Sequence, residues 1–312
     1  MKREWRRQLR TLSCALGAAS VVLATVVATV AVDPGVASAA RRPLCVGTAD
    51  NPGVLAGSFR SGVRIEGVCT VNGGPTVVRG ALTILPDSTL VAAFALNDLT
   101  GKGSSRLTVL GGISVRPGAT LILGCDPGSF SCIDDPNPDA PTLSAAETVR
   151  GVIRESSPLG VIIHDATING NVRQTGGGGD GSCAVPTTGV FSLFQSPVYS
   201  AYEDMTIHGN LTITNVKTCW MGVDRVVDSG SVTLTKNQTA DPDAIEILSN
   251  TISGDLKCAS NTSVWDSAEA AFGQTGLYPR TPGPNTVNGS RLGQCVLASP
   301  ATEGGPPGPG PF

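Results

Sequence analysis

A short internal repeat restricts the fold of this chain more than any other feature of its 312 residues. The segment 80–90 (GALTILPDSTL) matches the segment 111–121 (GGISVRPGATL), 31 residues further along. Each copy contains a glycine, a short strand with alternating apolar residues, a turn led by proline and a second apolar run. Repetition of such a strand–turn–strand unit is typical of architectures in which similar units stack on one another.

A shorter form of the repeat continues downstream as Φ-x-G-x-Φ-x-Φ, where Φ is apolar. Segments 207–213 and 252–258 fit this pattern, and 168–174 fits it except at the last residue. Segment 230–234 keeps only the second half, and 287–289 is a degenerate last copy. The glycines of all these copies stand at positions 80, 111, 170, 209, 230, 254 and 289. Their spacings are near one, two or three units of about 20 residues, with insertions.

The repeat predicts an all-β fold, a single-stranded right-handed parallel β-helix (β-solenoid) with loop insertions and disulfides. One winding cannot bury its apolar side alone, so windings must stack and like residues form files along the stack. The Thr-x-Thr segments 212–214 and 233–235 are expected to stack, and so are Asn171 and Asn210. A sandwich of two antiparallel sheets also has short strands between glycine and proline turns, and it remains the alternative. Only in the β-helix do the two long copies lie side by side.

Composition agrees with an ordered β protein. Hydrophobic residues make up 40% and charged residues 15%, which is too apolar for a disordered chain. The 39 glycines and 22 prolines argue against a helical bundle. The net charge is −3 and no long basic run follows the first ten residues, so no nucleic-acid partner is expected.

The N-terminus has the pattern of a secretory signal peptide. Five Lys and Arg residues precede an uncharged apolar stretch over 12–32, and Ala37-Ser38-Ala39 supplies a small-x-small cleavage pattern. We therefore predict a signal peptide over 1–39 and secretion, with a retained signal anchor as the alternative. The remaining chain would carry a net charge of −6, and no membrane partner is expected after cleavage.

The rest of the chain is expected to form one domain. We predict a solenoid domain over 40–299 with an N-terminal cap over 40–60, since an open end would expose sheet edges. The Gly- and Pro-rich tail 300–312 has no capacity for a core and is expected to be disordered.

Eight cysteines follow the predicted signal peptide, and an even number in an exported chain implies disulfides. Pairing between neighbours in the sequence is the simplest proposal, although other connectivities remain open. A zinc site is the competing interpretation, but the chain has no C-x-x-C motif and only two histidines. The proposed pairs are Cys45–Cys69, Cys125–Cys132, Cys183–Cys219 and Cys258–Cys295.

The repeat also resembles a known class of proteins. Segment 115–123 (VRPGATLIL) is similar to a rung of the pectin-lyase-like parallel β-helix proteins. The I-x-G-N-[VL] rungs, with an even cysteine set, resemble uncharacterised secreted β-helix proteins of GC-rich bacteria. The resemblance covers most of residues 60–295. It implies a fold and not an activity.

No convincing catalytic constellation stands out from this resemblance. Pectin-degrading β-helix hydrolases share paired-Asp motifs, a G-H-G and an R-I-K, whereas this chain has Ile207-His208-Gly209 and Arg64-Ile65-Glu66. His164 and Asp165 are candidates for an acid–base pair, with His208 some windings away. We expect both histidines to be ordinary surface residues.

Two acidic loops are calcium candidates, and one aromatic group is a candidate for glycan binding. The calcium candidates fit Ca²⁺ loops only in part, and no other cofactor is expected. The aromatic rings could stack on sugars, but packing of an insertion over the windings is favoured. The calcium candidates are Asp135, Asn137, Asp139, Asp241, Asp243 and Glu246, and the rings are Phe191, Phe194, Tyr199 and Tyr202.

These observations favour a secreted, non-catalytic β-solenoid with an extracellular structural or glycan- and surface-binding role. Polysaccharide or cell-wall material is the expected partner, and the sequence does not define the oligomeric state. A β-helix polysaccharide lyase or glycoside hydrolase is the first alternative. A surface adhesin is the second.

Overall fold

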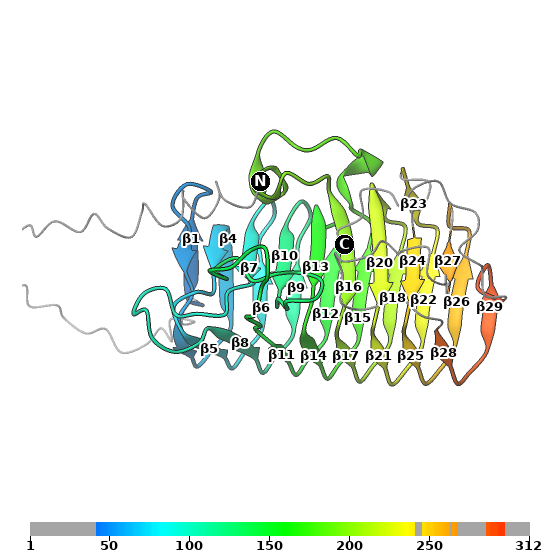
Figure 1. The fold of residues 1–312 in the computed structure, drawn as a ribbon, viewed down its shortest axis with the longest axis horizontal. Helices are drawn as coiled ribbons and strands as arrows, with labels where there is room; N and C mark the ends of the chain where they lie inside the picture. The colour runs from blue at the N-terminus through cyan, green and yellow to red at the C-terminus, as the bar shows by residue number, and fades with distance from the viewer. Residues whose placement is uncertain (1–41, 241–244, 263, 267–284, 297–312) are drawn as a thin grey trace, which may run out of the picture.

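The computed structural model describes residues 42–240, 245–262, 264–266 and 285–296, and it is built almost entirely from short parallel strands. The predicted signal peptide 1–39, the predicted disordered tail 300–312 and the calcium candidates Asp241 and Asp243 therefore lie outside the described residues. The chain runs repeatedly through three sides of one elongated stack (Figure 1). We call one pass through the three sides a winding, and the sides faces A, B and C.

Faces A and B belong to one 18-stranded sheet, and face C is a 9-stranded sheet. Face A contains β1 (Leu44–Gly47), β4 (Val63–Thr70), β6 (Leu82–Ile84), β9 (Ile113–Val115), β12 (Ile153–Ser156), β15 (Val172–Thr175), β18 (Leu211–Thr214), β22 (Val232–Thr235), β26 (Leu256–Ala259) and β29 (Arg291–Gly293). Face B contains β2 (Gly53–Val54), β7 (Thr89–Ala92), β10 (Thr120–Leu123), β13 (Gly160–Ile163), β16 (Tyr199–Glu203), β20 (Trp220–Asp224), β24 (Ile245–Leu248) and β27 (Trp265–Asp266). Face C contains β3 (Gly57–Phe59), β5 (Pro75–Val78), β8 (Arg106–Val109), β11 (Glu147–Val149), β14 (Ala166–Ile168), β17 (Thr206–Ile207), β21 (Val227–Asp228), β25 (Thr251–Ile252) and β28 (Thr286–Val287).

Strand β4 explains why faces A and B form one sheet. Its first residues pair with β1 and β6, and its last residues pair with β2 and β7. Gly67 stands between the two parts with a φ of 69°, a left-handed conformation that costs glycine little. The first face therefore turns directly into the second within one strand.

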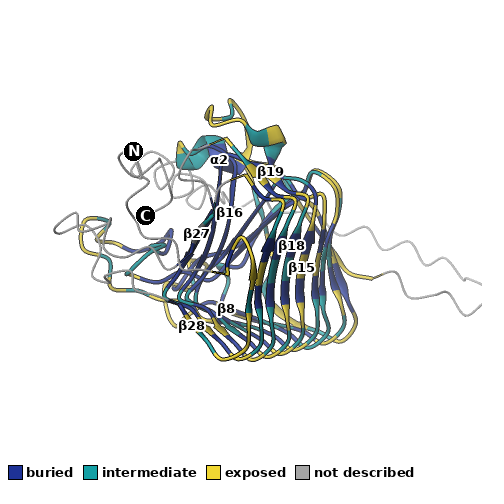
Figure 2. Cartoon of the chain, turned by 90° about the vertical axis from the view of Figure 1, so that its right-hand side faces the viewer, coloured by how far each residue is buried: buried dark blue, intermediate teal, exposed yellow. Residues whose placement is uncertain are grey.

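Each strand pairs in parallel with its counterpart one winding away, so the antiparallel sandwich is excluded for the part of the chain described. Leu82 of β6, for example, pairs with Ile113 of β9. A Cβ added to Gly111 would meet the carbonyl carbon of Gly80 at 2.6 Å, so the two long repeats are neighbours, as predicted. Viewed along the stack, β15 and β18, β16 and β27, and β8 and β28 mark its three sides (Figure 2). These features are consistent with an all-β parallel solenoid.

A single apolar core runs through the inside of the stack from Cys45 to Cys295. Face A strands alternate between inward apolar residues and outward polar residues, as in the burial of Leu211 and Ile213 against the half-exposed Thr212 and Thr214. The two Thr-x-Thr segments stack as predicted, and Thr214 and Thr235 share a hydrogen bond of 2.7 Å between their hydroxyls.

Face B differs because its outer side is also buried. A second apolar cluster there includes Ile122, Ile162 and Ala201, and it is covered by chain insertions that follow the strands. One insertion carries η2 (Gly179–Gly181) and α2 (Gly189–Phe194), which lie over the upper part of face B (Figure 2). Insertions therefore create a layer of buried side chains outside the windings, which the repeat pattern does not predict.

Side chains also form ladders at the corners between faces. The backbone N–H of Asn210 donates to Asn171 Oδ1 at 2.8 Å, which confirms the predicted asparagine pair. The same contact continues one winding further, from the N–H of Ser231 to Asn210 Oδ1. A second, buried ladder was not predicted: Val216 N–H donates to Asn237 Oδ1, and Asn237 N–H to Asn261 Oδ1.

The four predicted cysteine pairs are disulfides in the structure: Cys45–Cys69, Cys125–Cys132, Cys183–Cys219 and Cys258–Cys295. Such a set is typical of exported proteins. The last described elements are β19 (Lys217–Thr218) and β23 (Gln238–Thr239), which pair in parallel as a separate two-stranded sheet. None of the described helices is long and apolar enough to span a bilayer.

Candidate functional site

The site begins with a file of polar side chains at the ends of three neighbouring face B strands. His164 follows β13, Glu203 ends β16 and Asp224 ends β20. Glu203 pairs with Asp224, and His164 Nδ1 lies 3.9 Å from Glu203 Oε2. All three side chains point to the outer side of face B, because the residues before them, such as Tyr202 and Val223, face the core.

The next residue in each winding turns the corner and adds charge. Asp204 and Arg225 both have positive φ angles, of 51° and 55°. Arg225 donates from Nε to Asp204 Oδ1 at 2.8 Å and from Nη2 to Glu203 Oε2 at 2.6 Å. One guanidinium thus neutralises two carboxylates on the preceding winding.

A loop closed by the Cys125–Cys132 disulfide places three further side chains over this file. Asp126 Oδ1 accepts the backbone N–H groups of Gly128 and Ser129, which forms a turn at Pro127-Gly128. Ser129 Oγ lies 2.9 Å from Asp126 Oδ2, 2.5 Å from Asp204 Oδ2 and 3.4 Å from His164 Nδ1. The Phe130 ring stacks on His164 with centroids 4.9 Å apart.

In the described part of the chain, three potential metal ligands come together: Asp126, His164 and Asp204. Each offers one ligand atom, and these atoms lie within 4.8 Å of one another. We call these residues, with Ser129, the DHDS cluster.

Burial and charge act against each other in and beside this cluster. Burial acts to raise the pKa of Asp204, but contacts with His164, Arg225 and Ser129 outweigh it and hold that pKa well below its usual value. Burial, together with the neighbouring Glu203 charge, raises the pKa of Asp224 well above its usual value. Asp204 of the cluster and Asp224 of the neighbouring file therefore have opposed proton affinities.

The placement of the predicted catalytic candidates differs from expectation. The prediction that His164 is a surface residue is wrong: it is 1% exposed, because the 125–132 loop covers it. Asp165 is half-buried at the corner, and His208 is exposed beyond β17 on face C. The two histidines lie on different faces and form no common site.

The aromatic candidates are mostly packing residues. Phe191, Tyr199 and Tyr202 are buried, and Phe194 is half-buried. Phe191 packs edge-on against Tyr199, and Phe194 packs edge-on against Phe130. Their rings therefore offer little area to a sugar.

The calcium candidates do not share one environment. Asp135 is buried, and its carboxylate accepts the N–H groups of Asn137, Thr142 and Leu143, each at 2.8 Å. The side chains of Asn137 and Asp139 are exposed. Glu246 is buried on β24. Asp135 thus organises its own loop.

Sequence analysis missed Asp126, Ser129, Glu203, Asp204, Asp224 and Arg225, although a signal for four of them was present. The dipeptides His164-Asp165, Glu203-Asp204 and Asp224-Arg225 each begin six residues before a repeat glycine, at 170, 209 and 230. Equal distance from the repeat glycine places residues at the same position of successive windings. Asp126 and Ser129 carry no such signal, because they belong to an insertion.

A second surface of interest is the exposed outer side of face A. One file along it contains, in register, Arg64, Thr83, Ser114, Arg154, Arg173, Thr212, Thr233 and Lys257. Both arginines of the adjacent pair Arg154 and Arg173 are exposed, and no ion pair among the described residues involves them. Glu66 is the acidic residue that points outward from these strands.

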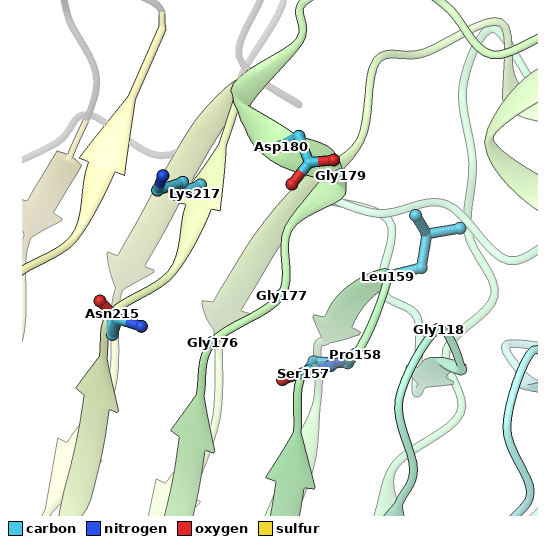
Figure 3. Close-up of a pocket in the computed structure, with 10 residues that line it drawn as sticks. All are labelled: Gly118, Ser157, Pro158, Leu159, Gly176, Gly177, Gly179, Asp180, Asn215 and Lys217. Carbon is cyan, nitrogen blue, oxygen red and sulfur yellow. The ribbon is translucent and has the colours of Figure 1, made fainter.

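A hollow of about 380 Å³ lies at the border between faces A and B. It is lined by the turns after β12, β15 and β18, with Asn215 and Lys217 at the left and Asp180 at the top of Figure 3. Much of its wall is backbone of the glycine-rich segment 176–179. The DHDS cluster does not line it.

Comparison with protein-family models, with curated proteins and with solved structures finds no match. The functional conclusions below therefore rest on the geometry of the chain itself.

Proposed function

We propose that this protein is an exported, non-catalytic single-stranded right-handed parallel β-helix that acts outside the cell as a structural or glycan-binding element, and that face A binds anionic polysaccharide. The predicted signal peptide and the four disulfides support export. The regular exposed strands of face A support binding to an extended polymer.

The pair Arg154 and Arg173 is the observation that carries this proposal. The two residues are direct partners on adjacent parallel strands, about 4.8 Å apart in a sheet. Like charges at directly opposed positions destabilise a sheet. A bound anion would relieve this repulsion, and Arg64 and Lys257 extend the positive file along the stack.

The burial of the other charged cluster supports a non-catalytic role. His164, Glu203 and Asp224 are each no more than 1% exposed, so a polymer cannot contact them without displacement of the covering loop. A general acid or base must reach the proton that it transfers. The alternative of a polysaccharide lyase or glycoside hydrolase has its best support in this cluster, and a surface adhesin remains the second alternative.

A binding assay tests the proposal with a charge-matched control. The double variant Arg154→Thr/Arg173→Thr gives face A the side chains of the next windings, where Thr212 and Thr233 stand. We expect this variant to bind polygalacturonate about tenfold more weakly than the wild type, because two charge contacts are lost. Binding by the wild type should weaken at high salt, because salt screens exposed charges. Arg79→Thr/Arg150→Thr removes the same charge beside face C and should leave the affinity unchanged.

Equal binding by wild type and the face A variant would refute the role of face A. Binding to neutral insoluble glycan alone would contradict the anionic ligand class. Release of reducing ends or unsaturated products would favour the enzyme alternative.

A further inference from the structure

Unsatisfied polar atoms concentrate beside the DHDS cluster. Several buried side-chain oxygen or nitrogen atoms of the described residues have no hydrogen-bond partner. Three of them, His164 Nε2, Glu203 Oε1 and Asp224 Oδ2, belong to the single file on face B. Buried polar groups in folded proteins are almost always hydrogen-bonded, so such a concentration indicates a missing partner.

The one hydroxyl of the cluster faces two carboxylates, of which Asp204 also accepts from Arg225. Ser129 Oγ lies within hydrogen-bond distance of both Asp126 Oδ2 and Asp204 Oδ2. A hydroxyl has one hydrogen, so it can donate to only one of the two carboxylates. His164, which is 1% exposed, has Nδ1 directed at the same hydroxyl, but at 3.4 Å. The imidazole is therefore buried, with Nδ1 3.4 Å from Ser129 Oγ and 3.9 Å from carboxylate oxygens of Glu203 and Asp204, and with no partner on Nε2.

The charge balance leads to the same conclusion. Three buried or nearly buried carboxylates, of Glu203, Asp204 and Asp224, lie around the guanidinium of Arg225, and a fourth, that of Asp126, lies in the DHDS cluster beside Asp204. Buried charges in proteins are paired or coordinate metal ions. A second positive charge at the DHDS cluster would balance Asp126, which is 5% exposed and which Arg225 does not contact.

We propose that Asp126, His164 and Asp204 bind one divalent transition-metal cation, with Ser129 as a hydroxyl ligand. An imidazole with carboxylates suits ions such as Zn²⁺, whereas Ca²⁺ takes oxygen ligands alone. The ion would link the 125–132 loop to the windings that carry His164 and Asp204. Because protein side chains surround it, its role is structural. This inference does not depend on polysaccharide binding by face A.

Metal uptake by the full, disulfide-bonded protein tests the proposal. After treatment with a chelator, the protein is titrated with Zn²⁺, and bound metal and the thermal midpoint are measured. We expect one Zn²⁺ per chain and a midpoint that rises with Zn²⁺ concentration, since the ion binds the folded state. Co²⁺ bound in its place should show visible absorption without a thiolate band, because all eight cysteines of the described residues form disulfides.

Asp126→Asn is the decisive variant. Its side-chain oxygen can still accept from Gly128 and Ser129, so the turn is kept, but an amide nitrogen replaces the oxygen that faces Ser129. We expect Zn²⁺ affinity to fall at least tenfold, whereas Asp87→Asn, at an exposed acid on another turn, should bind like the wild type. If Asp126→Asn does not fold, Ser129→Ala carries the same test with an expected severalfold loss.

Three results would overturn the proposal. The first is no uptake of Zn²⁺ or Co²⁺ by the wild type. The second is uptake of Ca²⁺ in preference to both ions, which would contradict the donor set. The third is unchanged Zn²⁺ affinity in the folded variants of Asp126 and Ser129.

Discussion

At the scale of single residues, the core of the stack contains a buried carboxyl group that the apolar repeat does not require. Tyr202 Oη lies 2.5 Å from Glu155 Oε2 and 2.8 Å from Gln174 Oε1. Gln174 Nε2 donates to Ser200 Oγ, so its oxygen faces Tyr202. One hydroxyl hydrogen cannot serve two acceptors, and a proton on Glu155 resolves this contact. Burial accordingly raises the pKa of Glu155 to about 7, although the Tyr202 hydrogen bond opposes the shift.

Glu155→Gln should change the pH dependence of stability. In the unfolded chain the Glu155 carboxyl group ionises near pH 4.5, and in the folded chain near pH 7. The folded state therefore binds more protons between these values, and the contribution of Glu155 to stability is present below pH 4.5 and lost as the pH rises to 7. The variant cannot ionise there, so it should gain up to about 3 kcal/mol relative to wild type between pH 4 and pH 8.

Denaturant unfolding at intervals between pH 4 and pH 8 measures this difference. Glu66→Gln, at an exposed position on face A, is the control and should follow the wild type at every pH. Parallel stability curves for wild type and Glu155→Gln would contradict the assignment.

At the scale of structural elements, a file of glycines forms the corner between faces C and A. A Cβ on Gly170 would lie 2.6 Å from the carbonyl oxygen of Gly151, and one on Gly230 would lie 2.2 Å from that of Gly209. These glycines have no unusual φ, so it is the close approach of neighbouring windings that requires them. The file includes Gly151, which interrupts the 59-residue gap between the predicted repeats at Gly111 and Gly170.

Gly170→Ala should therefore lower the stability of the stack by about 1–3 kcal/mol, because the added methyl group must displace backbone on the neighbouring winding. Asn169→Ala, at the exposed residue just before it, should change the thermal midpoint little. Thermal unfolding followed by circular dichroism compares the two variants. Equal midpoints would show that the windings can separate at this corner without cost.

At the scale of the whole molecule, disulfides hold both ends of the described stack. Cys45–Cys69 links β1 to β4, and Cys258–Cys295 links β26 to the residues after β29. Terminal repeats of stacked proteins have a neighbour on one side only, so they are the first to separate. The two bonds compensate for that missing neighbour.

Cys258→Ser/Cys295→Ser should destabilise the protein more than Cys125→Ser/Cys132→Ser. The first bond closes a loop of 37 residues and the second a loop of 7. In the chain-entropy model these loops correspond to about 4 and about 2 kcal/mol. Denaturant unfolding gives the two losses, and hydrogen exchange should locate the first in β26 and β29. A larger loss for the short loop would show that the end of the stack does not limit stability.

The sequence by itself determined the stacking unit, the neighbouring long repeats and the contact between Asn171 and Asn210, whereas the cysteine pairs were one of several connectivities that it left open. These features follow from local patterns that recur at one position of each winding. The same register, six residues before a repeat glycine, also contains the signal for the file of His164, Glu203 and Asp224.

Only the tertiary structure decided what covers that file. Gly151 and Gly170 are 19 residues apart, but Gly111 and Gly151 are 40 apart, because insertions of different length leave the windings. An insertion has no repeat register, so the approach of Asp126 and Ser129 to His164 and Asp204 depends on how the loop packs against face B. The burial of His164 and the charge imbalance around it arise from that packing.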